Sequence, residues 1–407
     1  MTATVVTGIG VVSPNGLGLE RYWAATLRGQ SAIRRITRFD PGSYPVTLAG
    51  QVDDFVVKDH VPSRLIPQTD RMTQFALAAS DWAIADAAVN PAELPDSDLG
   101  VVTASSSGGF EFGQRELQHL WSEGAGHVSA YMSFAWFYAV NAGQIAIRHG
   151  LRGPIGVFVT EQAGGLDAIA HARRKVRGGT SLVLTGAIDS SLSPYGIAAQ
   201  VASGRLSPRR DPGEAYLPFD DDASGYVPGE GGAILTLEDA GRARERDVRI
   251  YGEIAGYGAA FDPPPGSGRG PNLRRAIETA LADADVSTSD IAVVFADAAA
   301  VPELDHAEAA ALAELFGRGG VPVTAPKTMT GRLYSGAAPL DVVTALMALR
   351  DGVIPPTVNV TTAEAYGIDL VVGEPRPLTG SAALVLARGF GGFSSAMVVR
   401  SAAAVRH

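Results

Sequence analysis

Few residues of this chain have the types and spacing of a familiar catalytic motif. The glycines of Gly8-Ile9-Gly10 follow an apolar run, as in a dinucleotide-binding turn. However, the third glycine of that motif is missing, and Pro14-Asn15-Gly16 indicates a turn where a helix should begin. The sequence also has no Walker-type phosphate loop and no Gly-x-Ser-x-Gly nucleophile elbow. These patterns exclude the usual nucleotide-binding and serine-hydrolase chemistry.

Histidine and cysteine, which often transfer protons, attack substrates or bind metals, form no cluster. None of the 407 residues is cysteine, which excludes disulfides, thiolate zinc sites and a cysteine nucleophile. The seven histidines lack metal-ligand spacing, so we expect most of them to lie on the surface or to pack against other side chains. They are His60, His119, His127, His149, His171, His306 and His407. We therefore expect neither a metal nor a cofactor.

The elements that would position a site alternate between strands and helices. Apolar residues at helical spacing predict helices within residues 72–83, 166–170 and 273–281. Asp305 and Glu308 predict the N-terminal cap of another helix. Residues 155–160 have the composition of a buried strand. Strands are predicted at residues 5–12, 99–103, 155–160, 181–186 and 291–295. This alternation is typical of an α/β fold.

A faint internal repeat indicates that the fold is duplicated. Residues 85–102 lead from Ala-Asp-Ala-Ala-Val to Asp-Leu-Gly-Val-Val, and residues 282–294 follow a similar course. Chance similarity is common in alanine-rich sequence, so the repeat supports duplication without proving it. We expect an N-terminal half over residues 1–250 and a C-terminal half over residues 251–407.

Composition limits the partners and the location of the chain. Hydrophobic residues make up 46% and charged residues 19%, which suits a large buried core. The net charge of −10 argues against nucleic acid and anionic membranes as partners. The N-terminus lacks the pattern of a signal peptide, and no apolar stretch is long enough for a membrane span. We expect a soluble cytoplasmic protein.

Three segments together resemble the β-ketoacyl synthases of the thiolase superfamily. They are residues 5–16 (VVTGIGVVSPNG), 217–231 (LPFDDDASGYVPGEG) and 389–393 (GFGGF), the last similar to a glycine-rich active-site loop. The resemblance covers nearly the whole chain. It implies a thiolase-like fold, with two similar α/β halves in a layered αβαβα arrangement.

The family's catalytic residues are replaced at each matching position. Family members use a cysteine nucleophile at a helix N-terminus and two histidines that stabilise an enolate. By resemblance, Gln162 stands at the cysteine position, Asp297 and Arg332 stand at the histidine positions, and Lys327 is retained. A primary amide carries no thioester, and an aspartate would be an anion where a donor is needed. We expect no condensing activity.

Glutamine at the cysteine position is typical of the chain length factor, the ketosynthase β subunit of bacterial type II polyketide synthases. This resemblance implies a heterodimer with a ketosynthase α subunit, contact with acyl carrier protein, and a role in setting the length of a growing poly-β-ketone. Aromatic polyketide antibiotics are the expected products.

Whether the chain has an activity of its own stays open. Gln162 could hydrogen-bond locally in a silent pocket, or its amide could donate to a thioester oxygen and assist malonyl decarboxylation. A condensing enzyme that uses Thr160 would need an adjacent base, and the sequence offers none at a family position.

Four residues match the family's product-gating positions. Phe110, Gly113 and Leu117 share one helical face, and Tyr195 is the fourth. Relatives that make short products have bulky side chains at these positions. Gly113 and Leu117 fill less volume and should leave a longer cavity, so we expect a poly-β-ketone of about twenty carbons or more. Alternatively, Gly113 only relieves a helix-packing contact.

Overall fold

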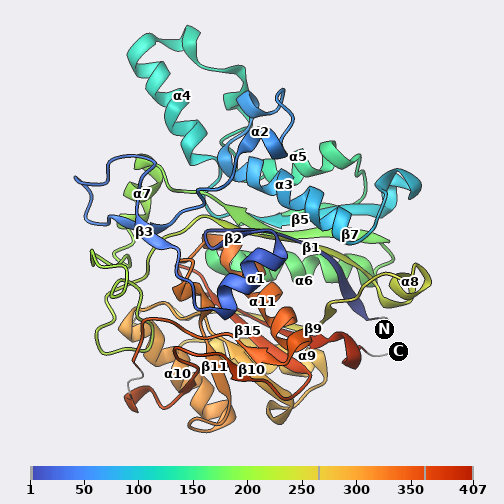
Figure 1. Cartoon of the computed structure of the whole chain (residues 1–407), viewed down its shortest axis with the longest axis vertical. Coiled ribbons are helices and arrows are strands. Elements are labelled where there is room, and N and C mark those ends of the chain that lie inside the picture. The colour runs from blue at the N-terminus through green and yellow to red at the C-terminus, as the bar shows by residue number, and fades with distance from the viewer. Residues whose placement is uncertain (1–2, 265, 362–363, 406–407) are drawn as a thin grey trace.

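Helices and sheets alternate through five layers in the computed structural model, which describes residues 3–264, 266–361 and 364–405 (Figure 1). Two helices cover the outer face of each sheet, and two lie between the sheets. The helices, taken from top to bottom of Figure 1, are α3 (Arg71–Asp86) and α5 (Val140–His149), α6 (Gly164–Arg177) and α11 (Ala337–Asp351), and α9 (Leu273–Ala284) and α10 (Pro302–Phe316). The predicted αβαβα arrangement is confirmed.

The two halves repeat one strand order. Five main strands of the first half run β6-β5-β7-β8-β1, and five of the second run β11-β10-β15-β16-β9, so both sets read 3-2-4-5-1 when these five are counted along the chain. The short strands β2 (Gly16–Leu17) and β13 (Asp369–Leu370) add to the edges of this pattern, beside β1 and β11. The first half contributes β1 (Thr4–Ser13), β5 (Leu99–Ala104), β6 (Ile155–Phe158), β7 (Leu182–Asp189) and β8 (Gly231–Asp239). The second contributes β9 (Gly252–Phe261), β10 (Ile291–Phe295), β11 (Pro322–Thr324), β15 (Ala382–Arg388) and β16 (Phe393–Ser401).

The internal repeat lies at equivalent places in the two halves. It covers the end of α3 leading into β5, and the end of α9 leading into β10. Antiparallel pairing of β1 with β9 joins the two sheets. A domain boundary between residues 250 and 251, just before β9, stays a prediction.

The central helices hold the middle of the molecule together. Every residue of α11 from Ala337 to Leu349 is buried, as expected of a helix that is enclosed on all sides. α11 packs against β8, β15, β16 and α6. Because α6 is enclosed in the same layer, the segment that leads into its N-terminus lies inside the molecule.

The glycines that resembled a dinucleotide motif serve close packing instead. A Cβ atom at Gly8 would lie 2.0 Å from the carbonyl oxygen of Ala83, and one at Gly10 would lie 1.9 Å from that of Ala79. Both carbonyls belong to α3. These glycines therefore let α3 approach β1 closely.

Two local predictions were wrong. Residues 155–158 form β6 at the outer edge of the first sheet, where Ile155 is 55% exposed, because an apolar run alone cannot show whether its neighbours cover it. Asp305 and Glu308 lie inside α10, which begins at Pro302. Their carboxylates accept from backbone N–H groups of other segments, and burial raises the pKa of Asp305 to about 8.

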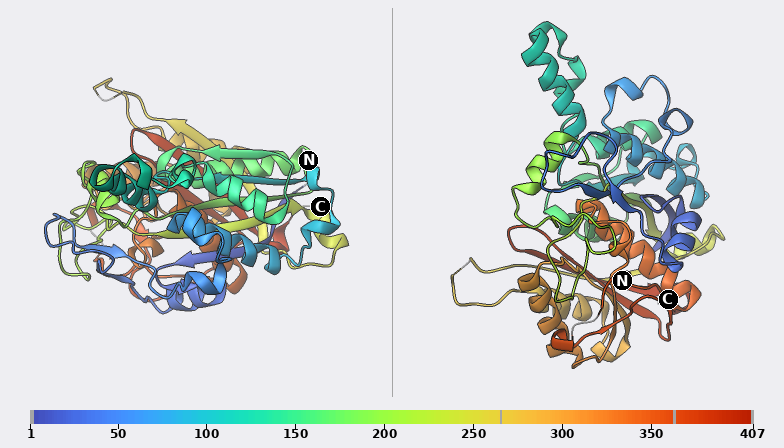
Figure 2. Two further views of the ribbon diagram at one scale, coloured as in Figure 1. Left: turned by 90° about the horizontal axis from the view of Figure 1, so that it is seen from above. Right: turned by 60° about the vertical axis from the view of Figure 1, so that its left-hand side comes forward.

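An arm formed by residues 110–139 projects from the body (Figures 1 and 2). It consists of α4 (Phe110–Glu123) and the segment that returns along it. Large hydrophobic side chains on the arm are exposed: Leu120, Trp121, Tyr131, Trp136, Phe137 and Tyr138. Within the described part of the chain, no helix has the length and apolar character needed to cross a membrane.

Candidate functional site

Gln162 lies in the centre of the molecule, at the entrance to α6. It belongs to a short 3-10 turn, Glu161–Ala163, that leads directly into this helix. Its side chain is buried, with 5% of the residue exposed. The fold therefore places Gln162 where backbone N–H groups at a helix N-terminus create a positive potential.

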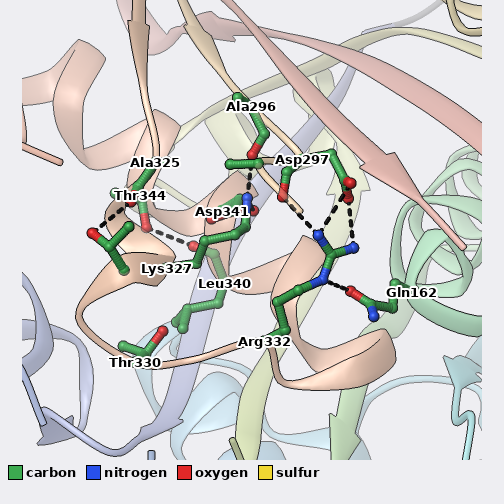
Figure 3. Close-up of polar contacts among 12 residues, drawn as sticks. Gln162, Ala296, Asp297, Ala325, Lys327, Thr330, Arg332, Leu340, Asp341 and Thr344 are labelled. Atoms are coloured by element: carbon green, nitrogen blue, oxygen red, sulfur yellow. Dashed lines mark hydrogen bonds and ion pairs between the residues drawn. The ribbon is translucent and has the colours of Figure 1, made fainter. Parts of the chain in front are cut away.

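The three substituted positions are brought together by one guanidinium group (Figure 3). Nε of Arg332 donates to the amide oxygen Oε1 of Gln162. Nη2 and Nη1 form a bidentate ion pair with Asp297, at 2.9 Å from Oδ1 and 3.1 Å from Oδ2. The same two nitrogens also donate to the carbonyl oxygens of Asp297 and Arg388. Every nitrogen of the guanidinium is therefore engaged.

Asp297 is held as an anion in this network. Burial by itself would raise the pKa of its carboxyl, but the charges of Arg332 and Lys327 outweigh burial and keep it below the ordinary value. Oδ1 also accepts from the backbone N–H of Arg388, at 2.8 Å. The carboxylate cannot donate a hydrogen bond to an enolate.

A second buried ion pair lies beside the first (Figure 3). Nζ of Lys327 is 2.9 Å from Oδ2 of Asp341 on α11 and also donates to the carbonyl oxygen of Ala296. Burial raises the pKa of Asp341, and the charge of Lys327 opposes that rise. Sequence reasoning missed Asp341. Its only signal was a lone carboxylate within the apolar run of residues 337–349.

Little space remains at this site. The cavity beside Gln162 has a volume of about 60 Å³, and its lining includes Tyr226, Arg332 and Phe390. Pockets that hold substrates usually measure roughly 300–1,000 Å³. In this conformation the cavity accommodates water rather than an acyl thioester.

Thr160, the alternative nucleophile, does have a neighbouring carboxylate that the sequence did not reveal. Its hydroxyl donates to Oδ2 of Asp167. Oδ1 of Asp167 also accepts from the hydroxyls of Tyr257, at 2.7 Å, and Ser395, at 2.5 Å. Asp167 is thus shared among three hydroxyl groups and is not paired with Thr160 alone, unlike the dedicated base of an activated nucleophile.

The four gating candidates lie at the base of the arm. The rings of Phe110 and Tyr195 are 5.0 Å apart, which joins α4 to α7 (Pro194–Val201). A Cβ atom at Gly113 would lie 3.4 Å from Cβ of Trp136 in the returning segment, so this glycine faces a packed neighbour. Leu117, two turns beyond Phe110, is half-buried. The gating role stays a prediction, and Trp136 is a neighbour that sequence reasoning missed.

Comparisons with known proteins agree with this geometry. Residues 1–243 match the model of the β-ketoacyl synthase N-terminal domain, and residues 251–361 match that of the C-terminal domain. The tetracenomycin polyketide synthase ketoacyl synthase beta subunit of Streptomyces glaucescens is 60% identical over 97% of this chain and 98% of its own length. The chain belongs to the β-ketoacyl synthase family, among the ketosynthase β subunits of type II polyketide synthases.

Two solved structures resemble this ketosynthase β subunit along nearly its whole length. The ishigamide ketosynthase/chain length factor matches with a TM-score of 0.89 at 26% identity, covering 98% of this chain and 99% of the other. A type II polyketide synthase acyl-carrier protein in complex with its hexaketide-bound ketosynthase (AntDE:AntF) matches with a TM-score of 0.87 at 26% identity and the same coverage.

Removing one partner of the Arg332–Asp297 pair should destabilise this ketosynthase β subunit strongly. Arg332→Met leaves a buried, unpaired carboxylate, so we expect the free energy of unfolding at neutral pH to fall by about 3–5 kcal/mol. Because the pKa of Asp297 is lowered in the folded wild type, the stabilisation is present above the unfolded pKa and is lost as pH falls. The difference between wild type and variant should therefore shrink as pH falls. The unpaired Asp297 of the variant takes up a proton first, because burial without its partner raises its pKa, and the wild type loses its own stabilisation below about pH 4. Urea denaturation between pH 3 and 8 measures both effects.

Two further variants serve as controls. Adding Asp297→Asn to Arg332→Met removes the stranded charge and should recover part of the loss. Arg152→Met breaks an exposed pair with Asp96, at 3.3 Å, and should cost less than about 1 kcal/mol. Equal losses from Arg332→Met and Arg152→Met would contradict the structural role of the buried pair.

Proposed function

We propose that this chain is the non-condensing subunit of a cytoplasmic ketosynthase heterodimer for aromatic polyketides. It pairs with a ketosynthase α subunit and sets the length of the poly-β-ketone built from malonyl-acyl carrier protein. The observation that carries this proposal is the closed network of Gln162, Arg332 and Asp297. By resemblance these residues stand at the three family catalytic positions, and their polar groups bind one another.

The network supports a silent site over a decarboxylating one. The amide oxygen of Gln162 accepts from Arg332, which fixes the orientation of the side chain. A malonyl thioester also needs more room than the cavity of about 60 Å³ provides. Arg332 is fully engaged by Asp297, Gln162 and the carbonyl oxygen of Arg388, so its N–H groups are not free to stabilise an enolate.

The exposed apolar surface supports a protein partner. On the arm, Trp121 is 78% exposed and Trp136 47% exposed. On β6 at the sheet edge, Ile155 is 55% exposed, and Val159 just beyond is 46% exposed. Exposed aromatic clusters and open sheet edges mark surfaces that another protein covers. We assign them to the α subunit, whose pairing would bring the base of the arm beside the growing chain.

Polyketide formation should need both subunits. We expect product from malonyl-acyl carrier protein when this chain is combined with its α subunit, and no product from this chain alone. Mass spectrometry of the products measures yield and chain length together. Condensation by the isolated chain would show that the site around Gln162 has been misinterpreted.

The variant Gln162→Ala distinguishes a silent site from a site that decarboxylates malonyl-acyl carrier protein. If the site is silent, malonyl-acyl carrier protein should lose carbon dioxide at the same rate with wild-type and variant heterodimers, within about twofold. A decarboxylating glutamine that stabilises the enolate would instead lose on the order of 100-fold in this variant. Release of labelled carbon dioxide gives the rate directly, and a loss of that size would favour the decarboxylase.

Filling the gate should shorten the polyketide. Gly113→Thr and Leu117→Phe add volume on one face of α4, so we expect products shorter by one or more two-carbon units. Gln118→Phe, on an exposed position of the same helix, is the matched control and should leave the length unchanged. Unchanged length in both gate variants would contradict the gate assignment and favour simple packing of Gly113 against Trp136.

A further inference from the structure

Two backbone N–H groups from distant parts of the chain converge on one carboxylate oxygen beside Gln162. The N–H of Gln162 and the N–H of Phe390 donate to Oε2 of Glu161, at 2.9 and 2.7 Å. Gln162 leads into α6, whereas Phe390 lies in the glycine-rich loop after β15. Among the described residues, these two amides are the hydrogen-bond donors to this carboxylate.

Convergent amides of this kind form an oxyanion hole when a substrate oxygen lies between them. Such donors are effective because they are already oriented and cost no rearrangement when charge develops on that oxygen. One of the two comes from the turn at a helix N-terminus, which adds a favourable potential for an anion. Here the chain's own carboxylate oxygen takes that place.

The surrounding backbone is shaped to hold Glu161 in this position. Glu161 has a φ of 54°, in the left-handed region that side chains other than glycine rarely adopt. Its carbonyl oxygen accepts from the hydroxyl of Ser335, at 2.8 Å, which fixes the peptide. A Cβ atom at Gly389 would lie 2.8 Å from the carbonyl oxygen of Thr160, 3.1 Å from Cβ of Glu161 and 3.2 Å from its Oε2, so glycine lets this loop approach both the backbone and the side chain of residues 160–161.

We propose that Glu161 is an internal plug that occupies a preserved two-amide oxyanion hole. The plug excludes the carbonyl oxygen of an acyl or malonyl thioester from the two N–H groups of Gln162 and Phe390. It acts separately from the Arg332–Asp297 pair, which binds the side chain of Gln162 and not its backbone. The site is therefore silenced twice, by loss of the nucleophile and by occupation of the oxyanion hole.

The test introduces a thiol into a chain that has no other cysteine. Gln162→Cys is prepared alone and together with Glu161→Gly, which suits the left-handed backbone at position 161. Each variant is assembled with the α subunit, and intact mass spectrometry counts labels on the β chain only. The probes are the acetyl thioester of N-acetylcysteamine and iodoacetamide.

The two reagents differ in their need for an oxyanion hole. In acylation, the thiolate bonds to the carbonyl carbon, the oxygen carries the negative charge, and the N-acetylcysteamine thiolate then leaves. In alkylation, the thiolate displaces iodide and no oxyanion forms. We expect Glu161→Gly to raise the ratio of acylation to alkylation by about 100-fold over Gln162→Cys alone. An unchanged ratio would overturn the proposal.

Two control variants test whether the effect comes from emptying the oxyanion hole. One removes only the negative charge of the carboxylate, and the other relieves only the strain of a left-handed residue. Glu161→Gln with Gln162→Cys removes the charge but keeps an oxygen that can accept from both amides, so the ratio should stay low. Asp247→Gly with Gln162→Cys relieves another left-handed residue, with a φ of 53°, away from the site, and should also leave the ratio low. A rise in either control equal to that of Glu161→Gly would overturn the proposal.

The inference rests on the non-condensing role proposed above but not on the control of product length. A failed thiol test would leave that role intact, because the missing nucleophile supports it independently. Conversely, a chain that sets no product length would still give a clear acylation ratio.

Discussion

The centre of the molecule depends on the buried pair formed by Arg332 and Asp297. Each charge would cost several kcal/mol to bury alone, so the pair requires good geometry and additional hydrogen bonds. Gln162, from the N-terminal half, supplies one of these bonds to Arg332. The backbone of Arg332 also exchanges hydrogen bonds with residues 227–229. Through its side chain and its backbone, Arg332 thus ties the two halves of the molecule together.

The backbone and the side chains of this site differ in what they retain from the family. The course of the main chain still directs the N–H groups of Gln162 and Phe390 at one point, because backbone amides do not change with the side chains attached to them. The side chains around that point have become a structural network. Glu161, Asp297 and Arg332 satisfy the polar groups of the site from within, as burial requires.

The surface of the protein complements its closed interior. The arm of residues 110–139 projects with exposed aromatic rings, and β6 presents an open strand edge. If a partner covers the arm, as proposed above, it would enclose the space beside Phe110 and Tyr195, whose rings lie 5.0 Å apart. Under that proposal, the exposed arm and strand edge carry the function of this chain, and the buried network at the centre stabilises the fold that presents them.

The resemblance to the β-ketoacyl synthases implied the layered αβαβα order. The residues themselves indicated an α/β class, five of the strands, several of the helices, the internal repeat and the absence of a cysteine nucleophile. These follow from residue identity and from local apolar periodicity, which act over a few residues. Tertiary structure alone decided that Gln162 meets Arg332, 170 residues away, and that Asp305 accepts from the amide of Phe219, 86 residues away. It also decided that β6 lies at an edge and that Asp341 pairs with Lys327. A side chain's partner depends on which segments folding brings beside it, and local sequence does not record that.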